Sequence, residues 1–462
     1  MAIDQVTSGL IKNDAITATK IAAGAVEIAD VADDAITSAK IAAGAVDATA
    51  LGSNAVTTAK INADAIDGTK IADNAVNSEH VTAGAIDTAH IGDDQVTGAK
   101  IENNPTIAGN LSAGGDLAIT GKTTLTGDFI PSTPLSHRNL IINGDMGVAQ
   151  RGGTHTGVGG TTKTYSLDRW TYMFGYGTPA QRMTLSRQQD SASLAAGFRN
   201  SFRADCTTVE SNLGSNTSRY SGIFQLIECQ NLHHLLYGTS DAKTLTLSFW
   251  VKSSLTGTHG IGVMINNGGA ALPQSYTVNT ADTWEYKQVT IAGNTSAAIG
   301  TTEYGMGVGF LLNLGTNQLS GTQNTWGTKL GHTAVANLMG NTSYNLYITG
   351  VQLELGSNAT PFEHRSHGDE LRRCQRYYEH DPLGSGNIWA FPITHSSDGY
   401  RRAPIYFKVP KRVTPSTNVT STGNTAPTSN QNMSTNGFAV AWNGVSDGSY
   451  KEVTSWTANS EL

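Results

Sequence analysis

The chain has 462 residues, of which 51 are glycine, and a formal net charge of −7 at pH 7. This length predicts several domains, and an acidic balance without a basic run argues against nucleic acid as a partner. No apolar stretch reaches the roughly 18 residues of a membrane helix. The N-terminal residues lack the pattern of a secretory signal, so we expect synthesis in a cytoplasm. The three cysteines predict neither a disulfide framework nor a zinc site.

A fixed period of five residues dominates the first hundred positions. Every fifth residue is a branched aliphatic, in the series Val6, Ile11, Ile16, Ile21, Val26, Val31, Ile36, Ile41, Val46, Leu51, Val56, Ile61, Ile66, Ile71, Val76, Val81, Ile86, Ile91, Val96 and Ile101. Five residues advance an α-helix by about 140°, and an odd period alternates between the two faces of a strand. The chain is therefore expected to turn within each repeat, at Ala-Gly-Ala segments such as 23–25 and at acidic pairs such as 33–34.

One aliphatic in five residues cannot enclose a core within a single chain, because the small residues between them bury too little area. Several copies around a shared axis could bury each aliphatic, at roughly 1.5–3 kcal/mol per side chain. We therefore expect residues 1–102 to form an oligomeric shaft with Ile16, Ile21, Ile36, Ile41, Ile61, Ile66, Ile71, Ile86 and Ile91 in its core. A monomeric pentapeptide solenoid is the alternative. Thr17, Thr37 and Thr57 are expected to cap single helical turns, and the shaft lysines to extend along the surface or pair with aspartates.

The rest of the chain divides into four predicted segments. Residues 103–136 contain very short strands separated by glycine, and three copies of this segment could form a triple β-helix or prism. Residues 137–366 are expected to form a jelly-roll β-sandwich with strands at 244–252, 284–291, 306–312 and 344–355. Residues 367–380 form a predicted linker helix, with Leu371, Cys374 and Tyr378 on one face. Residues 381–462 are expected to form a small β module, named here the tip, with strands at 403–409, 437–442, 450–453 and 455–458.

Four stretches of this sequence resemble the tail fibres of bacteriophages. They are the repeats of the type seen at 34–42, the segments Asn139–Met146 and Ser166–Trp170, the segment Ile348–Gly356 with Thr360–His364, and Cys374–Tyr378. The resemblance implies a mainly β, fibrous homotrimer in the virion, with a repeat shaft, a β-prism, a jelly roll, a linker helix and a tip. It also implies that the N-terminal end joins the phage tail or an adaptor protein. The C-terminal end would then bind a host-surface glycan or an outer-membrane receptor.

The tip concentrates aromatic and arginine side chains among turn residues. Trp389, Tyr400, Arg401 and Trp442 are the candidate receptor-binding residues, because aromatic faces and planar polar groups suit glycans. Core packing is the alternative for each of them. In the jelly roll, Trp250 and Trp284 lie on alternating strands and are interpreted as structural.

No catalytic constellation, cofactor site or metal site is predicted. Glu354 and Glu363 could form a glycosidase pair, but a structural strand and a surface loop are the favoured interpretation. Asp145 and Asp168 could bind calcium or brace a loop, and His233-His234 lacks a third ligand. The chain is therefore expected to be a receptor-binding fibre without enzymatic activity. A polysaccharide-degrading tailspike and a trimeric bacterial adhesin are the rival functions. The first would need a long parallel β-helix with clustered acids, and the second a secretion signal and an anchor.

Overall fold

The computed structural model describes residues 11–85 and 136–462, except for short gaps at 48, 54, 64, 68, 73–74, 77, 83–84, 161–162, 190–196, 212, 214–216, 266–268, 333–334, 383–388, 391–393, 396–399, 423–426, 428 and 444–451. The chain divides into two compact units, Met1–Thr123 and Thr124–Leu462. The predicted β-prism at 103–136 and the shaft residues Ile86 and Ile91 fall outside the described residues, apart from Ser136.

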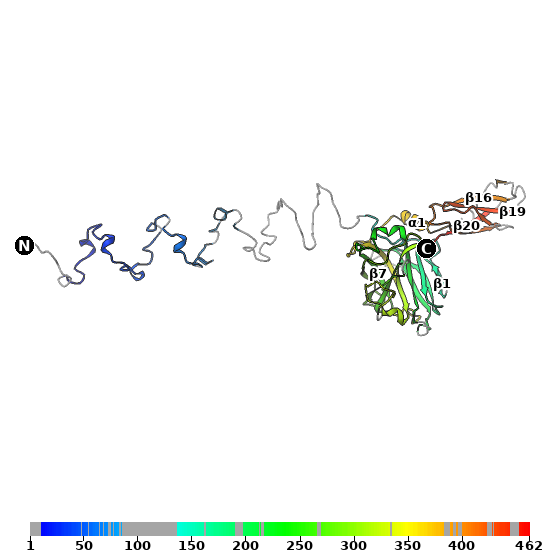
Figure 1. Cartoon of the computed structure of the whole chain (residues 1–462), viewed down its shortest axis with the longest axis horizontal. Helices are drawn as coiled ribbons and strands as arrows, with labels where there is room; N and C mark the ends of the chain where they lie inside the picture. Colours follow the sequence, from blue (N-terminus) through cyan, green and yellow to red (C-terminus); the bar gives the residue numbers. More distant parts are fainter. Residues whose placement is uncertain are drawn as a thin grey trace, which may run out of the picture. The chain divides into compact units, whose positions relative to one another are not determined.

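The shaft alternates single 3₁₀ turns with β-turns, as the blue ribbon of Figure 1 shows. The 3₁₀ helices are η2 (Ala18–Lys20), η3 (Ile28–Asp30), η4 (Ser38–Lys40), η5 (Thr58–Lys60) and η6 (Ser78–His80). Between them the backbone reverses where Gly24 has a φ of +79° and Asp34 a φ of +62°. These are left-handed conformations that glycine and aspartate tolerate best. The predicted turns are confirmed in the part of the shaft that the structure describes.

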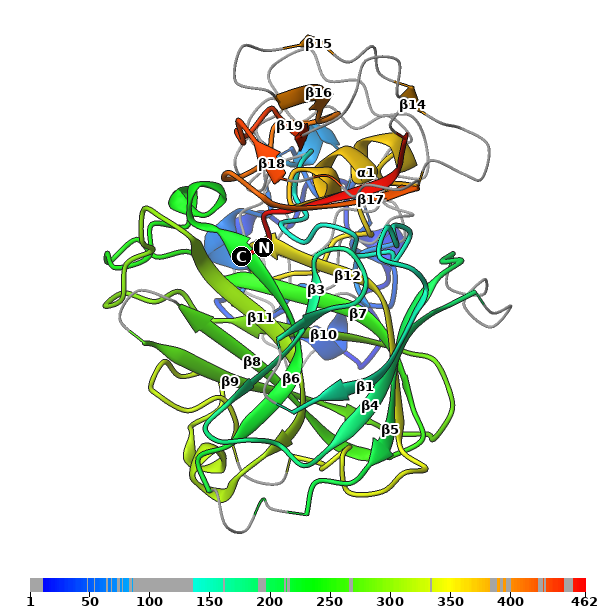
Figure 2. The same cartoon turned by 90° about the vertical axis from the view of Figure 1, so that its right-hand side faces the viewer.

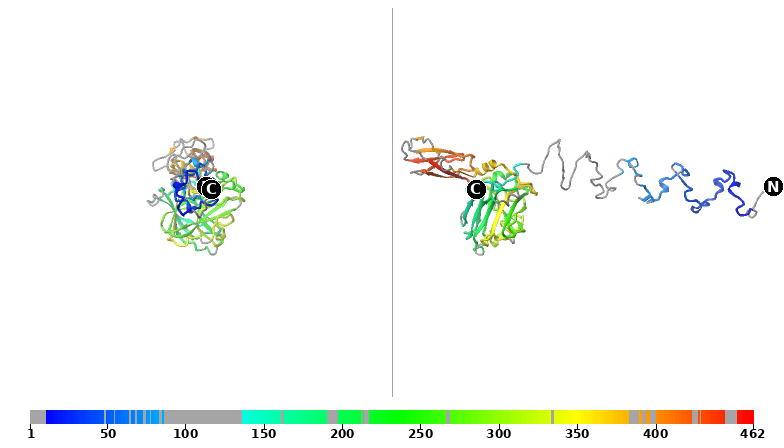
Figure 3. Two further views of the ribbon diagram at one scale, coloured as in Figure 1. Left: turned by 90° about the vertical axis from the view of Figure 1, so that its left-hand side faces the viewer. Right: turned by 180° about the vertical axis from the view of Figure 1, so that it is seen from behind.

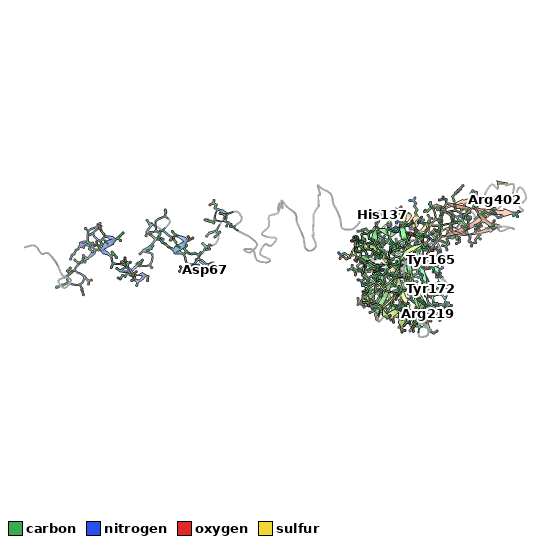
Figure 4. The ribbon with its side chains drawn as sticks, in the orientation of Figure 1. Asp67, His137, Tyr165, Tyr172, Arg219 and Arg402 are labelled. Atoms are coloured by element: carbon green, nitrogen blue, oxygen red, sulfur yellow. The ribbon has the colours of Figure 1, made fainter. Side chains whose placement is uncertain are left out.

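The polar residues of the shaft are only partly as predicted. Thr17 occupies the N-cap position of η2, but its side chain makes no capping hydrogen bond. The ammonium group of Lys20 donates to the carbonyl oxygen of Ala15 at 2.7 Å, and twenty residues later Lys40 makes the same contact with Ala35 at 2.6 Å. A lysine–aspartate pair of the expected kind joins Lys70 to Asp67, the residue labelled in Figure 4. These lysines therefore bond to the backbone or to an aspartate within a few residues of their own position.

The aliphatic series of the shaft is solvent-exposed in the single chain. From Ile11 to Val76, each member is between 38% and 61% exposed. No described residue of the shaft is buried, so this part of the chain has no core of its own.

Two six-stranded antiparallel sheets form the β-sandwich predicted for residues 137–366, as Figure 2 shows. The first sheet has the order β1-β4-β5-β12-β7-β10, and the second has the order β2-β3-β6-β11-β8-β9. Their bounds are β1 Thr154–Gly159, β2 Thr164–Tyr165, β3 Trp170–Gly175, β4 Arg182–Gln188, β5 Ser201–Thr208, β6 Tyr220–Glu228, β7 Leu245–Ser253, β8 Gly257–Ile265, β9 Ala271–Val278, β10 Glu285–Ile291, β11 Tyr304–Leu314 and β12 Asn345–Leu355. The four strands predicted here correspond to β7, β10, β11 and β12.

The sandwich core follows from the two-residue period of its strands. On β7, the fully buried residues Leu245, Leu247, Phe249 and Val251 belong to the core. Their neighbours Thr246, Ser248, Trp250 and Lys252 therefore face away from it, on the outer face of the first sheet. This outer face carries the candidate site.

The linker helix is shorter than predicted. Helix α1 spans His367–Gln375, and strand β13 (Tyr378–Pro382) already begins where the prediction still had a helix. The Ser366 side chain caps α1 by accepting from the Asp369 amide at 3.2 Å. Of the predicted apolar face, Cys374 is buried and Leu371 half-buried, whereas Tyr378 pairs with Asn459 of the tip. The helix ends early because Tyr378 pairs with Asn459 as the first residue of strand β13.

The tip contains two four-stranded sheets, seen from behind in the right-hand view of Figure 3. One joins β13, β20 (Glu452–Asn459), β14 (Trp389–Ala390) and β17 (Ser416–Thr422); the other joins β15 (Thr394–His395), β16 (Tyr400–Tyr406), β19 (Gly437–Asn443) and β18 (Ser429–Gln431). The two strands predicted at 450–453 and 455–458 are a single strand, β20. Among the described residues, no helix is long and apolar enough to cross a membrane.

Candidate functional site

A cleft of about 550 Å³ lies on the outer face of the first sheet of the sandwich. Aromatic side chains and small residues line this aromatic cleft, namely Phe198, Ser248, Trp250, Tyr286, Gly350, Ala359, Thr360, Pro361, Phe362 and His364. An aromatic hollow with a few polar groups at its margin is the usual form of a small-molecule or sugar site.

Two aromatic rings on neighbouring strands form one side of the cleft. Trp250 on β7 and Tyr286 on β10 are directly opposite in the antiparallel register. Their ring centroids are 5.6 Å apart, with planes tilted by 55°. Tyr286 is 46% exposed and Trp250 is half-buried. Because the core-facing positions of both strands alternate with these two, the rings are held on a rigid sheet and remain open to solvent.

A bulge in β12 shapes the opposite side. The register of β12 with β7 shifts between Thr349 and Gln352, and Gly350 within this bulge has a φ of +59°. A Cβ at Gly350 would lie 2.5 Å from the ring of Phe198. Both the positive φ and the contact require glycine here. The ring of Phe198 is buried against this glycine and meets Phe362 edge-on at 4.9 Å.

The segment after β12 forms the wall of the cleft, and two buried polar side chains anchor it. Glu354 is 1% exposed and accepts hydrogen bonds from the Thr360 amide at 2.8 Å and the Thr360 hydroxyl at 2.5 Å. Gln352, also buried, accepts from the Glu363 amide at 2.7 Å. These bonds fold residues 357–364 back over the sheet, which places Phe362 and His364 at the cleft.

Glu363 is also a structural carboxylate. It accepts from the Asn139 amide at 2.9 Å and pairs with Arg365 at 3.0 Å. Burial raises its pKa, but the Asn139 amide and the Arg365 guanidinium outweigh burial and hold the pKa below its ordinary value. The structural interpretation of Glu354 and Glu363 agrees with these contacts.

Cations lie on the same face beyond Trp250. The Lys252 ammonium lies 4.3 Å from the ring centroid of Tyr347 and 5.2 Å from that of Trp284. Arg203 lies 5.1 Å from the same tyrosine ring and pairs with Asp205 at 2.7 Å. This end of the face is therefore basic and aromatic, and its cations are held by ring faces.

The structure corrects one of the four predicted receptor residues of the tip, Trp442. Trp442 lies on β19 and is 1% exposed, packed in a core cluster with Val440 and Trp456. The expectation that Trp442 is an exposed receptor-binding residue is therefore wrong, and the alternative of core packing holds for it. Trp389 and Tyr400 lie on strands β14 and β16, where loops had been expected, and Arg401 is paired with Trp442 in the β16–β19 register. The side chains of these three residues lie outside the described part of the chain.

The aromatic cleft was missed by the sequence interpretation, which treated Trp250 as structural. The signal was present in the alternation of 244–252, because Trp250 has the same phase as Thr246, Ser248 and Lys252. Tyr286 likewise has the same phase as Gln288 and Thr290. A large aromatic in the polar phase of a strand predicts an exposed ring.

Two of the motifs that resemble tail fibres, Ser166–Trp170 and Cys374–Tyr378, lie at the junction between sandwich and tip. Arg169, 1% exposed, forms an ion pair with Glu461 and lies 3.5 Å from the ring centroid of Tyr377. Burial lowers the pKa of Arg169, but the Glu461 carboxylate more than offsets this, so the pKa is raised. Asp168 accepts from the Gln150 amide at 2.6 Å, and burial raises its pKa despite the nearby Arg151.

These contacts brace a loop, which was one of the two interpretations of Asp168. Asp145 accepts from the Gly147 amide at 3.2 Å, also within a loop. Among the described residues, no group of three or more His, Cys, Asp or Glu side chains could hold a metal ion. His233 and His234 are exposed on a short 3₁₀ helix, η11 (His233–Leu235).

No family model matches the sequence, and no curated protein is significantly similar to it. Among solved structures, the enzymatically active domain of tailspike protein 4 of Bacteriophage CBA120 matches 41% of this chain at 16% identity and a TM-score of 0.23. This chain covers only 19% of the length of that protein.

Two carbohydrate-binding modules from Clostridium thermocellum also match. The family 11 module of a cellulosomal cellulase matches 45% of this chain and 97% of its own length, at 13% identity and a TM-score of 0.23. The C-terminal family 22 module of a xylanase matches 44% of this chain and 98% of its own length, at 12% identity and a TM-score of 0.24. At such identities and scores, these similarities assign no ligand to this chain.

Proposed function

We propose that the aromatic cleft binds a glycan. The observation that carries this proposal is the pair of solvent-open rings, Trp250 and Tyr286, fixed side by side on a rigid sheet within a cleft of about 550 Å³. Sugar rings present apolar C–H faces that pack on aromatic rings, while their hydroxyls bond to polar groups at the margin. Ser248 and the exposed His364 are polar residues that line this cleft.

We further propose that the chain is a bacteriophage tail fibre that attaches the virion to a host-surface glycan. The four stretches that resemble tail fibres occur here in the same order as in that family, which supports the proposal. The exposed aliphatic series of the shaft supports it as well. In this proposal three chains join through the shaft, whose N-terminal end meets the tail or an adaptor protein. Three identical weak sites then gain avidity from their high effective concentration. In this proposal the glycan site lies in the sandwich and not in the tip, and no ligand is assigned to the tip.

Attachment without hydrolysis is the third part of the proposal. Both oxygens of Glu354 accept hydrogen bonds from Thr360, and Glu363 is committed to Asn139 and Arg365. Protein incubated with a bound polysaccharide is expected to release no new reducing ends. Release that disappears in Glu354→Gln or Glu363→Gln would contradict this and favour a tailspike.

The cleft is tested by replacing its open aromatics in the full chain. Trp250→Ala and Tyr286→Ala should each weaken glycan binding by roughly 1–2 kcal/mol per site, since ring truncation removes the main contact surface. Binding is measured on an array of bacterial surface polysaccharides and then by titration calorimetry with the polysaccharides that the wild type retains.

Tyr406→Ala is the matched control. Tyr406 lies on β16 of the tip and is 77% exposed, so its ring is at least as accessible as that of Tyr286. The control should bind as the wild type does, and all three variants should melt close to the wild type. Loss of binding in Tyr406→Ala with full binding in Trp250→Ala would return the site to the tip.

A further inference from the structure

A second cavity lies beside the aromatic cleft, where strands β7 and β10 of the first sheet meet residues of β9 from the second sheet. It has a volume of about 280 Å³ and is lined mainly by Thr246, Gln274, Gln288, Thr290, Gln323 and Ser357. We name it the amide pocket, because three glutamine carboxamides contribute to it. No charged side chain is among its lining residues.

The amide pocket and the aromatic cleft are neighbours along β7 and β10. Three successive outward pairs in the register of these strands are Thr290 with Thr246, Gln288 with Ser248, and Tyr286 with Trp250. The first pair belongs to the amide pocket and the third to the aromatic cleft. In the middle pair, Gln288 lines the pocket and Ser248 lines the cleft. From the first pair to the third is four residues, about 13 Å of strand, which is longer than one pyranose ring.

The glutamines of the pocket differ in how they are engaged. Gln274 is buried, donates to the Thr290 carbonyl oxygen at 2.6 Å, and accepts from the Gln323 amide group at 2.7 Å. These bonds fix the orientation of both carboxamides. Gln288 is exposed, and its carboxamide makes no hydrogen bond to a described residue. Gln288 lines the amide pocket and is paired in the strand register with Ser248 of the aromatic cleft. A ligand can therefore use the donor and the acceptor of Gln288 without displacing a protein contact.

We propose that the two cavities form one groove that holds consecutive residues of a linear glycan, with a neutral, hydroxyl-rich sugar in the amide pocket. The proposal rests on the function proposed for the aromatic cleft and specifies its ligand. Carboxamides pair with hydroxyls as both donors and acceptors, whereas a carboxylate sugar would enter this pocket without a cation to meet it. The basic side chains Lys252 and Arg203 lie on the other side of Trp250, away from the pocket.

The test compares binding of oligosaccharides of increasing length to the full chain. The probes are linear neutral series of glucose, xylose and N-acetylglucosamine, and a galacturonate series, each from one to six residues. In the series that the wild type binds, affinity should rise steeply once the oligosaccharide spans both cavities. Gln288→Ala and Gln323→Ala should lower the affinity for the longest oligosaccharides by about three- to tenfold. The affinity for the shortest oligosaccharides that bind should not change. Trp250→Ala should lower the affinity for oligosaccharides of every length.

Gln230→Ala is the control for the glutamine variants, because Gln230 is exposed and lies outside both cavities. It should match the wild type at every length. Affinity that does not depend on length, or glutamine variants that match the wild type on the longest probes, would overturn the extended groove while leaving the aromatic cleft in place. Preference for the galacturonate series would overturn the neutral pocket. A wild type that binds no probe, or a Trp250→Ala variant that binds normally, would instead contradict the proposed function itself.

Discussion

The shaft and the sandwich contain the same aliphatic residue types, but only the sandwich buries them within one chain. Leu245, Leu247 and Val251 of β7 are fully buried, whereas Ile61 and Ile66 of the shaft are 40% and 54% exposed. A two-residue period places the aliphatics of each strand on one face, which a second sheet covers. In the shaft, an aliphatic residue at every fifth position with a turn in every repeat does not form a surface that another part of the same chain covers. Residue type alone therefore does not define a core. The spacing of the aliphatic residues decides whether the same chain can cover them or whether other copies of the chain are needed.

The largest effect is expected from a charge in the aliphatic series of the shaft. In a trimer, Ile61→Asp would place three carboxylates near the shared axis, at a cost of several kcal/mol. Light scattering of the full chain over a dilution series should show a trimer for the wild type and dissociation for the variant. Ile28→Asp is the matched control, because Ile28 lies outside the five-residue series and is 95% exposed. A monomeric wild type would refute the shaft assignment.

A truncation in the sandwich core should act within one chain. Phe249 is fully buried and meets Phe310 and Tyr276 edge-on, at 4.9 and 5.0 Å between ring centroids. Phe249→Ala should destabilise the sandwich by about 3–5 kcal/mol. In calorimetry, its unfolding temperature should not depend on protein concentration, whereas that of an oligomeric shaft should. Val209→Ala, at an exposed aliphatic, should have little effect. If the unfolding temperature of the sandwich changed with protein concentration, the sandwich would also depend on contacts between chains, and the contrast with the shaft would be wrong.

The sequence predicted those features that depend on local periods. Turns at Gly24 and Asp34 follow from residues that tolerate positive φ, and β7, β10, β11 and β12 follow from alternation. The helix end was not predicted, because Tyr378 leaves a helical pattern to pair with Asn459, which lies far along the chain. Long-range pairing outweighed local propensity there.

The aromatic cleft was harder to predict because it depends on tertiary contacts. Phe198 reaches the cleft from outside the regular strands, and its place depends on a bulge at Gly350 that alternation cannot indicate. The wall depends on buried hydrogen bonds of Gln352 and Glu354, and a structural strand position for Glu354 did not indicate which segment it would hold. In the tip, Trp442 stands beside a turn in sequence, but β19 is flanked on both sides by β16 and β18, and its ring is covered.

Truncation of Trp442 sharpens the contrast between a core aromatic and an open one. Trp442→Ala should lower the stability of the tip by about 3 kcal/mol, because the tryptophan belongs to a small core with Phe438 and Val440. Glycan binding by the sandwich should be unchanged. Differential scanning calorimetry and the polysaccharide array measure the two effects, with Tyr406→Ala as the exposed control. Reduced binding at unchanged thermal stability would show that the tip carries the receptor site.

The smallest effect concerns pH and the anchor of the cleft wall. Glu363 has a pKa below its ordinary value in the folded protein, because the Asn139 amide and Arg365 outweigh the opposing effect of burial. A lowered pKa means that the ionised form stabilises the fold above the unfolded pKa, about 4.3. This contribution is lost as the pH falls through the lowered pKa. Glu363→Gln should therefore cost on the order of 1 kcal/mol at pH 7, and the difference from the wild type should shrink below pH 4.

Urea unfolding between pH 3 and pH 7 measures this difference. Glu303→Gln serves as the control, since Glu303 is an exposed glutamate outside the cleft wall. A wild-type advantage over Glu363→Gln that stays constant across this range would mean that the carboxylate acts by packing alone. A shrinking advantage would show that an ionised Glu363 holds residues 357–364 against the sheet. Because Phe362 and His364 belong to this segment, glycan affinity should then fall over the same pH window as the stability difference.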